Sequence, residues 1–421
     1  MIQLVRGFKD ILPPETDLWQ HIEDEMRNIF ESFGFKHIRT PIVEQTELFA
    51  RGIGTTTDIV EKEMYSIANS GDESLSLRPE ATASVVRAYV EHKLYTENPI
   101  QKLYTIGPMF RRERPQKGRY RQFYQINAEA LGLALPEIDA ELILMISTLM
   151  KRLSAPDIEI NLNSLGCQGC RPSFRKELRA FIADKVELLC PDCKRRMDTN
   201  PLRVFDCKAE GCRKALEDAP DIIQYLCDPC KEHFEKVQNI LNRFQIGFKL
   251  NPRLVRGLDY YMRTAFEFIT PHLGSQSAVA GGGRYDGLVK ALDGPDLPGV
   301  GFAIGLDRLA ALLSDRIPEF SSHPMVFIAA LGRQPQYEAI VWLENIRLLG
   351  VRCEMDFENR SLKSQMRQAD RLGSTHALIV GEDELNKGNA TWRDMKTKEQ
   401  VIVPLAEIVT FIVKNLGKEK L

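Results

Sequence analysis

Residues 103–132 constrain the fold more than any other part of the chain, because they specify two neighbouring strands and the loop that joins them. An apolar run that starts at Leu103 ends abruptly at Arg111, and alternating residues from Arg121 to Ala130 predict a returning strand. From Arg111 to Arg121 there are six basic residues and one acidic residue. The local charge of about +5 predicts a β-hairpin with a strongly basic loop.

A solvated surface hairpin would explain the charge alone, but two charged residues lie on the strands, where a sheet would hold them rigidly. These are Arg111 and Glu129, and Phe123 lies between them. An arginine fork suits phosphate, an aromatic face can stack on a base, and a carboxylate accepts hydrogen bonds. The three residues together predict a nucleotide-binding site.

The run FRRERPQKGRYRQF (110–123), followed by Glu129, resembles motif 2 of the class II aminoacyl-tRNA synthetases, and specifically that of the histidyl-tRNA synthetase family. The resemblance implies a catalytic domain of the α+β class, built on a mixed, mostly antiparallel sheet. It also implies roles for the hairpin residues. These are Arg111, Arg119 and Phe123 for ATP, Gln125 and Glu129 for histidine, and Arg114 and Gln116 for the acceptor end of tRNA.

A second motif is LVRGLDYYMRTAFEF (254–268). Its alternation predicts a pair of strands with a bend at Gly257, and the charged residues Arg256, Asp259 and Arg263 interrupt the apolar pattern that a plain core strand would have. The segment resembles the histidine-specific motif of the same family. The resemblance implies that Arg256 lies against the α-phosphate and the substrate carboxylate, and that Tyr261 faces the imidazole.

Two glycine-bearing segments also resemble motifs of known synthetases. AGGGRYDGLV (280–289) resembles the second histidine motif of the family, which implies that Tyr285 lines the histidine pocket. GVGFAIGLDRLAALL (299–313) predicts a strand that runs into a helix and resembles motif 3 of the class II synthetases. That resemblance implies that Gly305 lies beside the nucleotide and that Arg308 points to its terminal phosphates. Asp307 stands where the family commonly has glutamate.

Residues 74–90, SLSLRPEATASVVRAYV, predict a strand followed by a helix, with Glu80 and Thr82 at the start of the helix. A glutamate in a first turn can simply complement the helix dipole. The family resemblance implies instead that Glu80 and Thr82 hold the amino group of histidine. Residues 34–54 predict a short strand stopped by Pro41 and resemble motif 1, which implies a homodimer.

Together these motifs predict three catalytic arginines, Arg111, Arg256 and Arg308, which converge on one triphosphate. Arginine suits this task because its planar fork stays protonated and binds phosphate in two places. The expected substrates and partners are L-histidine, ATP with Mg²⁺ and tRNA(His). The alternative is a paralogue without catalysis that regulates histidine biosynthesis; such chains lack the C-terminal domain and lose parts of the catalytic set.

The chain of 421 residues is long enough for two or three domains. No apolar run approaches membrane-spanning length, and the first residues are too polar for a secretory signal, so no membrane partner and a cytoplasmic location are expected. The patterns divide the chain into a catalytic domain in two parts, an inserted helical domain and an α/β domain. The expected ranges are 1–164 and 247–320 for the catalytic domain, 165–246 for the insertion and 325–421 for the α/β domain.

Eight of the nine cysteines lie in the insertion. Read in chain order, they give C-x2-C-x19-C-x2-C and then C-x4-C-x14-C-x2-C, near zinc-ribbon spacing. The spacing favours structural zinc with one or two ions, and an interleaved pairing is equally open. The alternative is a helical insertion whose thiols bind no metal. The candidate ligands are Cys167, Cys170, Cys190, Cys193, Cys207, Cys212, Cys227 and Cys230.

Beyond residue 325 strands and helices alternate, which predicts a mostly parallel sheet covered by helices. This part resembles the α/β anticodon-binding domain of class IIa synthetases. Cys353 lies in one of its strands and is interpreted as a core thiol.

Overall fold

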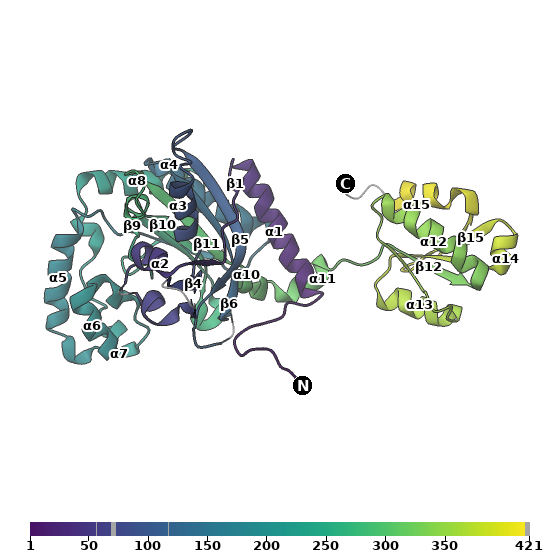
Figure 1. The fold of residues 1–421 in the computed structure, drawn as a ribbon, viewed down its shortest axis with the longest axis horizontal. Helices are drawn as coiled ribbons and strands as arrows, with labels where there is room; N and C mark the ends of the chain where they lie inside the picture. Colours follow the sequence, from purple (N-terminus) through teal and green to yellow (C-terminus); the bar gives the residue numbers. More distant parts are fainter. Residues whose placement is uncertain (56, 69–72, 117, 417–421) are drawn as a thin grey trace. The chain divides into compact units, whose positions relative to one another are not determined.

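The computed structural model describes residues 1–55, 57–68, 73–116 and 118–416, and the chain divides into two compact units (Figure 1). The first unit is Met1–Phe320 and the second is Ser321–Leu421. Within the described residues, none of the helices combines the length and the apolar character that crossing a membrane requires.

An eight-stranded sheet forms the centre of the first unit, in the order β1-β5-β6-β11-β10-β9-β7-β8. Neighbouring strands are antiparallel except for the two outermost pairs, β1 with β5 and β7 with β8. The predicted mixed, mostly antiparallel sheet is therefore confirmed. The strands are β1 (Lys36–His37), β5 (Gln101–Phe110), β6 (Gln122–Leu131), β7 (Glu159–Ser164), β8 (Lys249–Leu250), β9 (Met262–Ile269), β10 (Ala278–Arg284) and β11 (Gly299–Gly305).

Helices cover one face of this sheet and form the main core of the unit with it. The even-numbered side chains of β6, such as Ile126 and Ala128, pack into this core. The apolar stripe of the first helix is fully buried there, and Gly34 with a φ of 75° follows the end of that helix, a backbone conformation that suits glycine. The helices on this face are α1 (Glu15–Ser32), α4 (Pro136–Arg152), α8 (Asp228–Arg243) and α10 (Leu306–Leu312).

The opposite face of the sheet carries a second, smaller core. Because side chains alternate along a strand, the odd-numbered residues of β6, including Phe123, Gln125 and Glu129, face this side. Three helices and a small antiparallel sheet surround it. They are α2 (Thr46–Ile53), α3 (Thr82–Glu91), α9 (Leu288–Ala291), β2 (Val43–Gln45), β3 (Tyr65–Ile67) and β4 (Leu75–Leu77). The sequence pattern did not identify α2.

The strand pair predicted for residues 254–268 is wrong, because only β9 is a strand and the residues before it form a loop. The backbone of this loop finds partners outside any strand pairing. The Asn163 amide donates to the Leu254 carbonyl at 2.8 Å, and the Asp259 N–H donates to the Ile53 carbonyl at 3.0 Å. Because distant residues already form hydrogen bonds with these backbone groups, the loop needs no second strand to satisfy them.

The chain between β7 and β8 is mainly helical and holds the eight clustered cysteines (Figure 1). Its last helix, α8, is anchored to the main core by a buried charge network. Nε2 of His233 lies 2.7 Å from Asp139 Oδ2, and Arg284 donates to the same carboxylate at 2.6 Å. The other helices are α5 (Arg171–Ala183), α6 (Pro191–Thr199) and α7 (Glu210–Ala215), with 3-10 turns η2 (Val186–Leu188), η3 (Pro201–Asp206) and η4 (Ile222–Tyr225) between them.

The second unit is an α/β domain with a five-stranded sheet in the order β13-β12-β14-β15-β16. Two of its four pairings are parallel and two are antiparallel, so the sheet is not mostly parallel as predicted. The difference arises because the connections from β14 to β15, which holds only the short helix α14, and from β15 to β16, a tight turn, are both too short for a parallel crossover, which needs about a dozen residues or more. The elements are β12 (Val326–Leu331), α12 (Arg333–Leu348), β13 (Cys353–Met355), α13 (Leu362–Arg371), β14 (His376–Gly381), α14 (Glu382–Asn386), β15 (Asn389–Asp394), β16 (Gln400–Pro404) and α15 (Ile408–Leu416).

Candidate active site and metal centres

Arg111 lies at the end of β5, where the paired strands of the hairpin hold its backbone. Its N–H donates to the Arg121 carbonyl at 2.9 Å. Its Nε donates to the Pro79 carbonyl at 2.9 Å, and its guanidinium carbon lies 5.2 Å from the centroid of the Phe123 ring. The strand end, the loop before α3 and the aromatic ring therefore fix the direction of the guanidinium group.

The loop of the hairpin folds back on itself. Gln116 and Arg119 exchange backbone hydrogen bonds across the turn, and the Arg119 side chain forms an ion pair with Glu113. Arg114 and Gln116 are exposed at the tip, and Lys117 lies outside the described residues. Arg114 and Gln116, which are predicted to contact tRNA, therefore face solvent, whereas Arg119 turns inward.

Arg256 reaches the same region from the loop before β9. Its NH1 lies 3.1 Å from Glu267 Oε1, and its guanidinium carbon lies 5.5 Å from the centroid of the Tyr261 ring. The group lies over Gly281 of β10, where a Cβ atom would come within 2.4 Å of Arg256 NH1. The glycine is needed at that position because any side chain would displace the guanidinium group.

Arg308 projects from the first turn of α10 and donates to the Ala278 carbonyl at 2.8 Å and the Gly118 carbonyl at 3.3 Å. Burial and, to a smaller extent, the nearby positive charges of Arg111 and Arg119 lower its pKa to about 10. Burial also lowers the pKa of Arg111 and of Arg119. Guanidinium groups that repel one another in this way favour the binding of an anion between them.

These arginines line one cavity of about 190 Å³. It is formed by the hairpin, the glycine-bearing strands β10 and β11, and the start of α10, so segments far apart in the chain meet there. Of the predicted site residues, it brings together Arg111, Arg119, Phe123, Gln125, Arg256, Gly305 and Arg308.

A buried cluster beside this cavity contains five of the residues that are predicted to bind histidine: Glu80, Thr82, Glu129, Tyr261 and Tyr285. The hydroxyl groups of Thr82 and Tyr285 both donate to the Glu129 carboxylate, the first at 2.7 Å. The carboxylate lies over Gly301 of β11, where a Cβ atom would clash with it. The Tyr260 ring contacts the Tyr261 ring, with centroids 4.6 Å apart, and completes the aromatic wall.

Glu80 also lies in this cluster, but its carboxylate is occupied by the backbone. It accepts hydrogen bonds from the N–H groups of Thr82 at 2.7 Å and Ala83 at 2.9 Å. These donors belong to the first turn of α3, so Glu80 caps the helix and fixes the position of the Thr82 hydroxyl. The contribution of Glu80 to the site in this structure is to orient its neighbour.

Burial raises the pKa of Glu129 to about 8, although its two hydroxyl donors act in the opposite direction. An unfolded chain would release this proton near the ordinary value of 4.5, whereas the folded chain keeps it until about pH 8. We therefore expect the free energy of unfolding to decrease as pH rises through this window. Urea denaturation between about pH 5 and about pH 8 should show a smaller decrease for Glu129→Gln than for the parent chain. An unchanged decrease would contradict the assignment, and Glu137→Gln, on the exposed surface of α4, is the control.

Two carboxylates of the site were not identified from the sequence, and Asp307 was assigned no role there. Glu113 pairs with Arg119, and Glu267 pairs with Arg256. Asp307 accepts the Tyr124 N–H at 2.6 Å, and burial raises its pKa to about 6. A signal existed for Glu267, because it is the one charged residue in the apolar run AFEFI of β9. No such signal marked Glu113, because it lies among the arginines of the loop.

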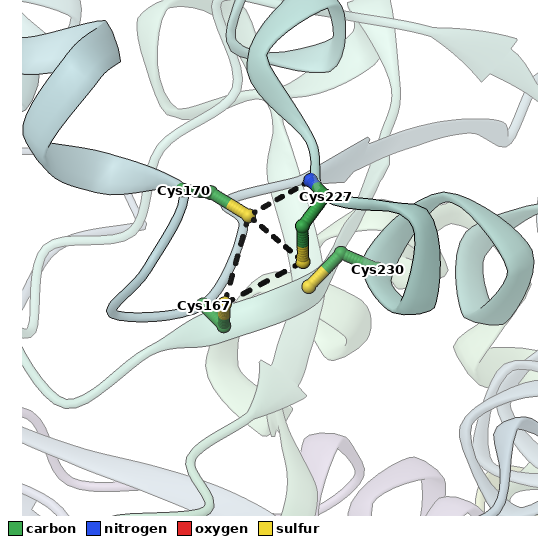
Figure 2. A group of neighbouring side chains, drawn as sticks. All are labelled: Cys167, Cys170, Cys227 and Cys230. Carbon is green, nitrogen blue, oxygen red and sulfur yellow. Dashed lines mark hydrogen bonds between the residues drawn. The ribbon is translucent and has the colours of Figure 1, made fainter.

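The cysteines form two separate tetrads, and their pairing is nested instead of following chain order. Cys167 and Cys170 meet Cys227 and Cys230 (Figure 2). The other tetrad is Cys190, Cys193, Cys207 and Cys212. In each tetrad the four sulfur atoms lie within 4.8 Å of one another.

The sulfur distances fit a tetrahedral metal centre better than disulfides. The Cys167 and Cys170 Sγ atoms are 3.6 Å apart, and the Cys190 and Cys207 Sγ atoms are 3.7 Å apart. Four sulfur atoms bonded at about 2.3 Å to a tetrahedral zinc ion would be separated by about 3.8 Å, whereas a disulfide requires about 2.05 Å. Both tetrads could hold a metal ion of this kind.

Two known protein families match separate parts of the chain. The histidyl-tRNA synthetase family matches residues 7–309, and an anticodon binding domain matches residues 326–415. A histidine–tRNA ligase of Desulfatibacillum aliphaticivorans is 56% identical over 96% of this chain and 97% of its own length. One from Geobacter metallireducens is 51% identical over 95% of this chain and 96% of its own length.

Solved structures share the fold of this chain. The apo crystal structure of the histidyl-tRNA synthetase of S. aureus superposes with a TM-score of 0.82 at 35% identity, covering 98% of this chain and 99% of that one. A structure from Bacillus halodurans C, described as an ATP phosphoribosyltransferase regulatory subunit/histidyl-tRNA synthetase, shares the fold with a TM-score of 0.65 at 19% identity, covering 90% of this chain and 98% of that one. The family match and the high identity over nearly the full length establish that the chain belongs to the histidyl-tRNA synthetase family.

Proposed function

We propose that the chain is a histidine–tRNA ligase. In the first step a carboxylate oxygen of L-histidine attacks the α-phosphorus of ATP, the bond to the β-phosphate breaks, and pyrophosphate leaves. In the second step a ribose hydroxyl at the 3′-terminal adenosine of tRNA(His) attacks the histidyl carbonyl, and AMP leaves. The observation that carries the proposal is the convergence of arginines from three separate motifs on one cavity beside the buried Glu129 cluster.

The arginines supply positive charge where negative charge builds up. Arg111 and Arg256 would hold the α-phosphate, with Arg256 also contacting the histidine carboxylate. Arg308 would hold the terminal phosphates, and Arg119 would assist it. Mg²⁺ bound with ATP would neutralise the pyrophosphate group. Preorganised donors of this kind contribute about 3 kcal/mol each to a transition state.

The remaining residues would orient the two small substrates. Phe123 would stack on adenine, with Gly305 leaving the backbone close to the nucleotide. Glu129, Tyr261 and Tyr285 would bind the imidazole of histidine. Thr82 and Gln125 would position its amino group, and Glu80 would do so by fixing Thr82. The Gln125 Oε1 atom is buried without a hydrogen-bond partner among the described residues.

The same proposal includes tRNA and a second copy of the chain as partners. Arg114 and Gln116, exposed at the hairpin tip, would contact the acceptor end of tRNA, and residues 325–421 would bind its anticodon. Residues 165–246 would act as an inserted domain within a catalytic domain formed by 1–164 and 247–320. A homodimer would form through the region of 34–54, where Ile42 is 41% exposed and Val43 is 40% exposed beside the small sheet.

The two cysteine tetrads would each hold one structural zinc ion. Four thiolates in tetrahedral geometry are the ligand set of structural zinc, and such a closed set leaves no position for a substrate. The tetrad of Cys167, Cys170, Cys227 and Cys230 (Figure 2) joins the entry of the insertion to the start of α8, its last helix. A metal there would hold these two segments together.

We expect the chain to catalyse exchange of labelled pyrophosphate into ATP that depends on histidine and on no other amino acid. Glu129→Ala should raise the KM for histidine by about 10- to 100-fold, with a smaller effect on the KM for ATP, because a hydrogen bond to a charged partner contributes about 1.5–3 kcal/mol. A regulatory paralogue would show no exchange, and that result would overturn the proposal. The retained arginines, the anticodon-binding domain and the identity to the ligases favour the enzyme.

A further inference from the structure

A second cavity, of about 160 Å³, lies where the cysteine-rich helices meet the loop before β9. One wall comes from α5, the end of α6 and the 3-10 turn η3, and the other comes from residues 255–261. Of its lining residues, the sequence motifs assign ligands to Arg256 and Tyr261 and none to the residues of the insertion. Because one wall belongs to the insertion, the cavity exists only when the two parts of the first unit are in contact.

The side chains that line this cavity carry more positive than negative charge, although Arg203 also pairs outside the lining with Asp206 at 3.0 Å and with Asp58 at 3.7 Å. Arg171, Arg175, Arg203 and Arg256 line it, and Asp259 is the one carboxylate among its lining residues. Nitrogen atoms of two of these arginines, Arg175 Nε and Arg203 NH1, are buried without a hydrogen-bond partner among the described residues. Guanidinium groups with unused donors that face a common cavity bind phosphate oxygens well.

The position of the cavity identifies which phosphate it receives. Its lining shares Arg256 with the first cavity and contains neither Arg119 nor Arg308. It also contains Tyr261, which belongs to the histidine side of the site. Pyrophosphate would leave from the Arg308 side, so an anion held here would instead approach the activated histidine from the opposite side of Arg256.

We propose that Arg171, Arg175 and Arg203 bind a phosphodiester group at the 3′ end of tRNA during the transfer step. This inference rests on the proposed ligase function and adds a subsite to it. A phosphodiester held there would place the terminal ribose next to Arg256, where the histidyl group is transferred. The insertion would thereby contribute directly to the second half-reaction and not to the first.

The decisive variant is Arg175→Ala, because the Nε atom of this side chain is buried without a hydrogen-bond partner among the described residues, so the substitution breaks no hydrogen bond of that atom. We expect kcat/KM for aminoacylation of tRNA(His) to fall about 10- to 100-fold, the effect of losing one charged hydrogen bond. Histidine-dependent pyrophosphate exchange should stay within about twofold of the parent, because Arg175 does not line the first cavity, where ATP would bind. The dependence of log KM for tRNA on log salt should lose about 0.7 from its slope, the value for one single-strand phosphate contact.

Lys176→Ala is the matched control, since Lys176 is an exposed basic residue on the same helix and does not line the cavity. Arg175→Lys should recover part of the lost aminoacylation. Unchanged aminoacylation by Arg175→Ala, or an equal loss of exchange and aminoacylation, would overturn the subsite. A raised KM for pyrophosphate with normal transfer would overturn it too, by assigning the cavity to free pyrophosphate. Absence of exchange in the parent chain would instead refute the ligase function itself.

Discussion

Replacing Arg308 with alanine is expected to lower the rate of histidine-dependent pyrophosphate exchange about 100- to 1,000-fold while the protein stays folded. The guanidinium group lies in the cavity with Arg111 and Arg119, and its pKa of about 10 reflects burial and the repulsion from those two groups. Removing one of three mutually repelling cations relieves this repulsion. The loss of activity should therefore come without a comparable loss of stability.

Arg256→Ala tests the same cavity from the other side. We expect a similar loss of exchange, but a larger decrease in the free energy of unfolding, because Glu267 loses its ion-pair partner at 3.1 Å. Exchange rates and urea denaturation curves of both variants separate the two effects. Lys290→Ala, at an exposed ion pair on the same unit, is the control and should change neither quantity. If both arginine variants keep full exchange, these groups do not bind the triphosphate.

Elemental analysis of the purified protein is expected to find about two zinc ions per chain, one for each tetrad. Cys193→Ser and Cys230→Ser, in different tetrads, should each reduce the zinc content by about one. Metal binding and folding of a small cysteine-rich domain are coupled, with about 10–16 kcal/mol available from each site. Either variant should therefore make the insertion unfold at lower temperature or expose it to proteases.

Cys353→Ser provides the control for the metal experiment, because Cys353 is the cysteine outside the insertion and packs in the core of the second unit. Its replacement should leave the zinc content unchanged. A metal-free protein whose insertion resists proteolysis as well as the parent would contradict the zinc assignment. A content of one ion, lost in one cysteine variant and kept in the other, would restrict zinc to a single tetrad.

Most of the candidate site was predictable because its residues occur in long, specific segments. The alternation of β6 alone predicts that Phe123, Gln125 and Glu129 share one face, and the structure shows this. The switch from strand to helix at residues 305–308 likewise predicts that Arg308 lies at the start of a helix. These features depend on residues close together in the chain, so local periodicity reports them.

The partners of those side chains were not predictable in the same way. The pairing of Arg256 with Glu267 depends on a loop that folds over β10, and the space for it depends on Gly281. The sequence shows a glycine run and a charged residue in a strand, but no local pattern relates one to the other. The incorrect strand prediction for 254–268 has the same origin, because its backbone partners come from Ile53 and Asn163.

By itself, then, the sequence determined the basic hairpin, the motif residues, the helical insertion rich in cysteine and the α/β character of the second unit. Only the tertiary structure decided that the cysteines form nested tetrads, that the loop at 255–261 closes over the sheet, and that a second cavity lined by arginines lies beside Arg256. The reason is physical. Local spacing controls the torsion angles and the faces of helices and strands, whereas contacts between distant residues are selected by the packing of the whole unit.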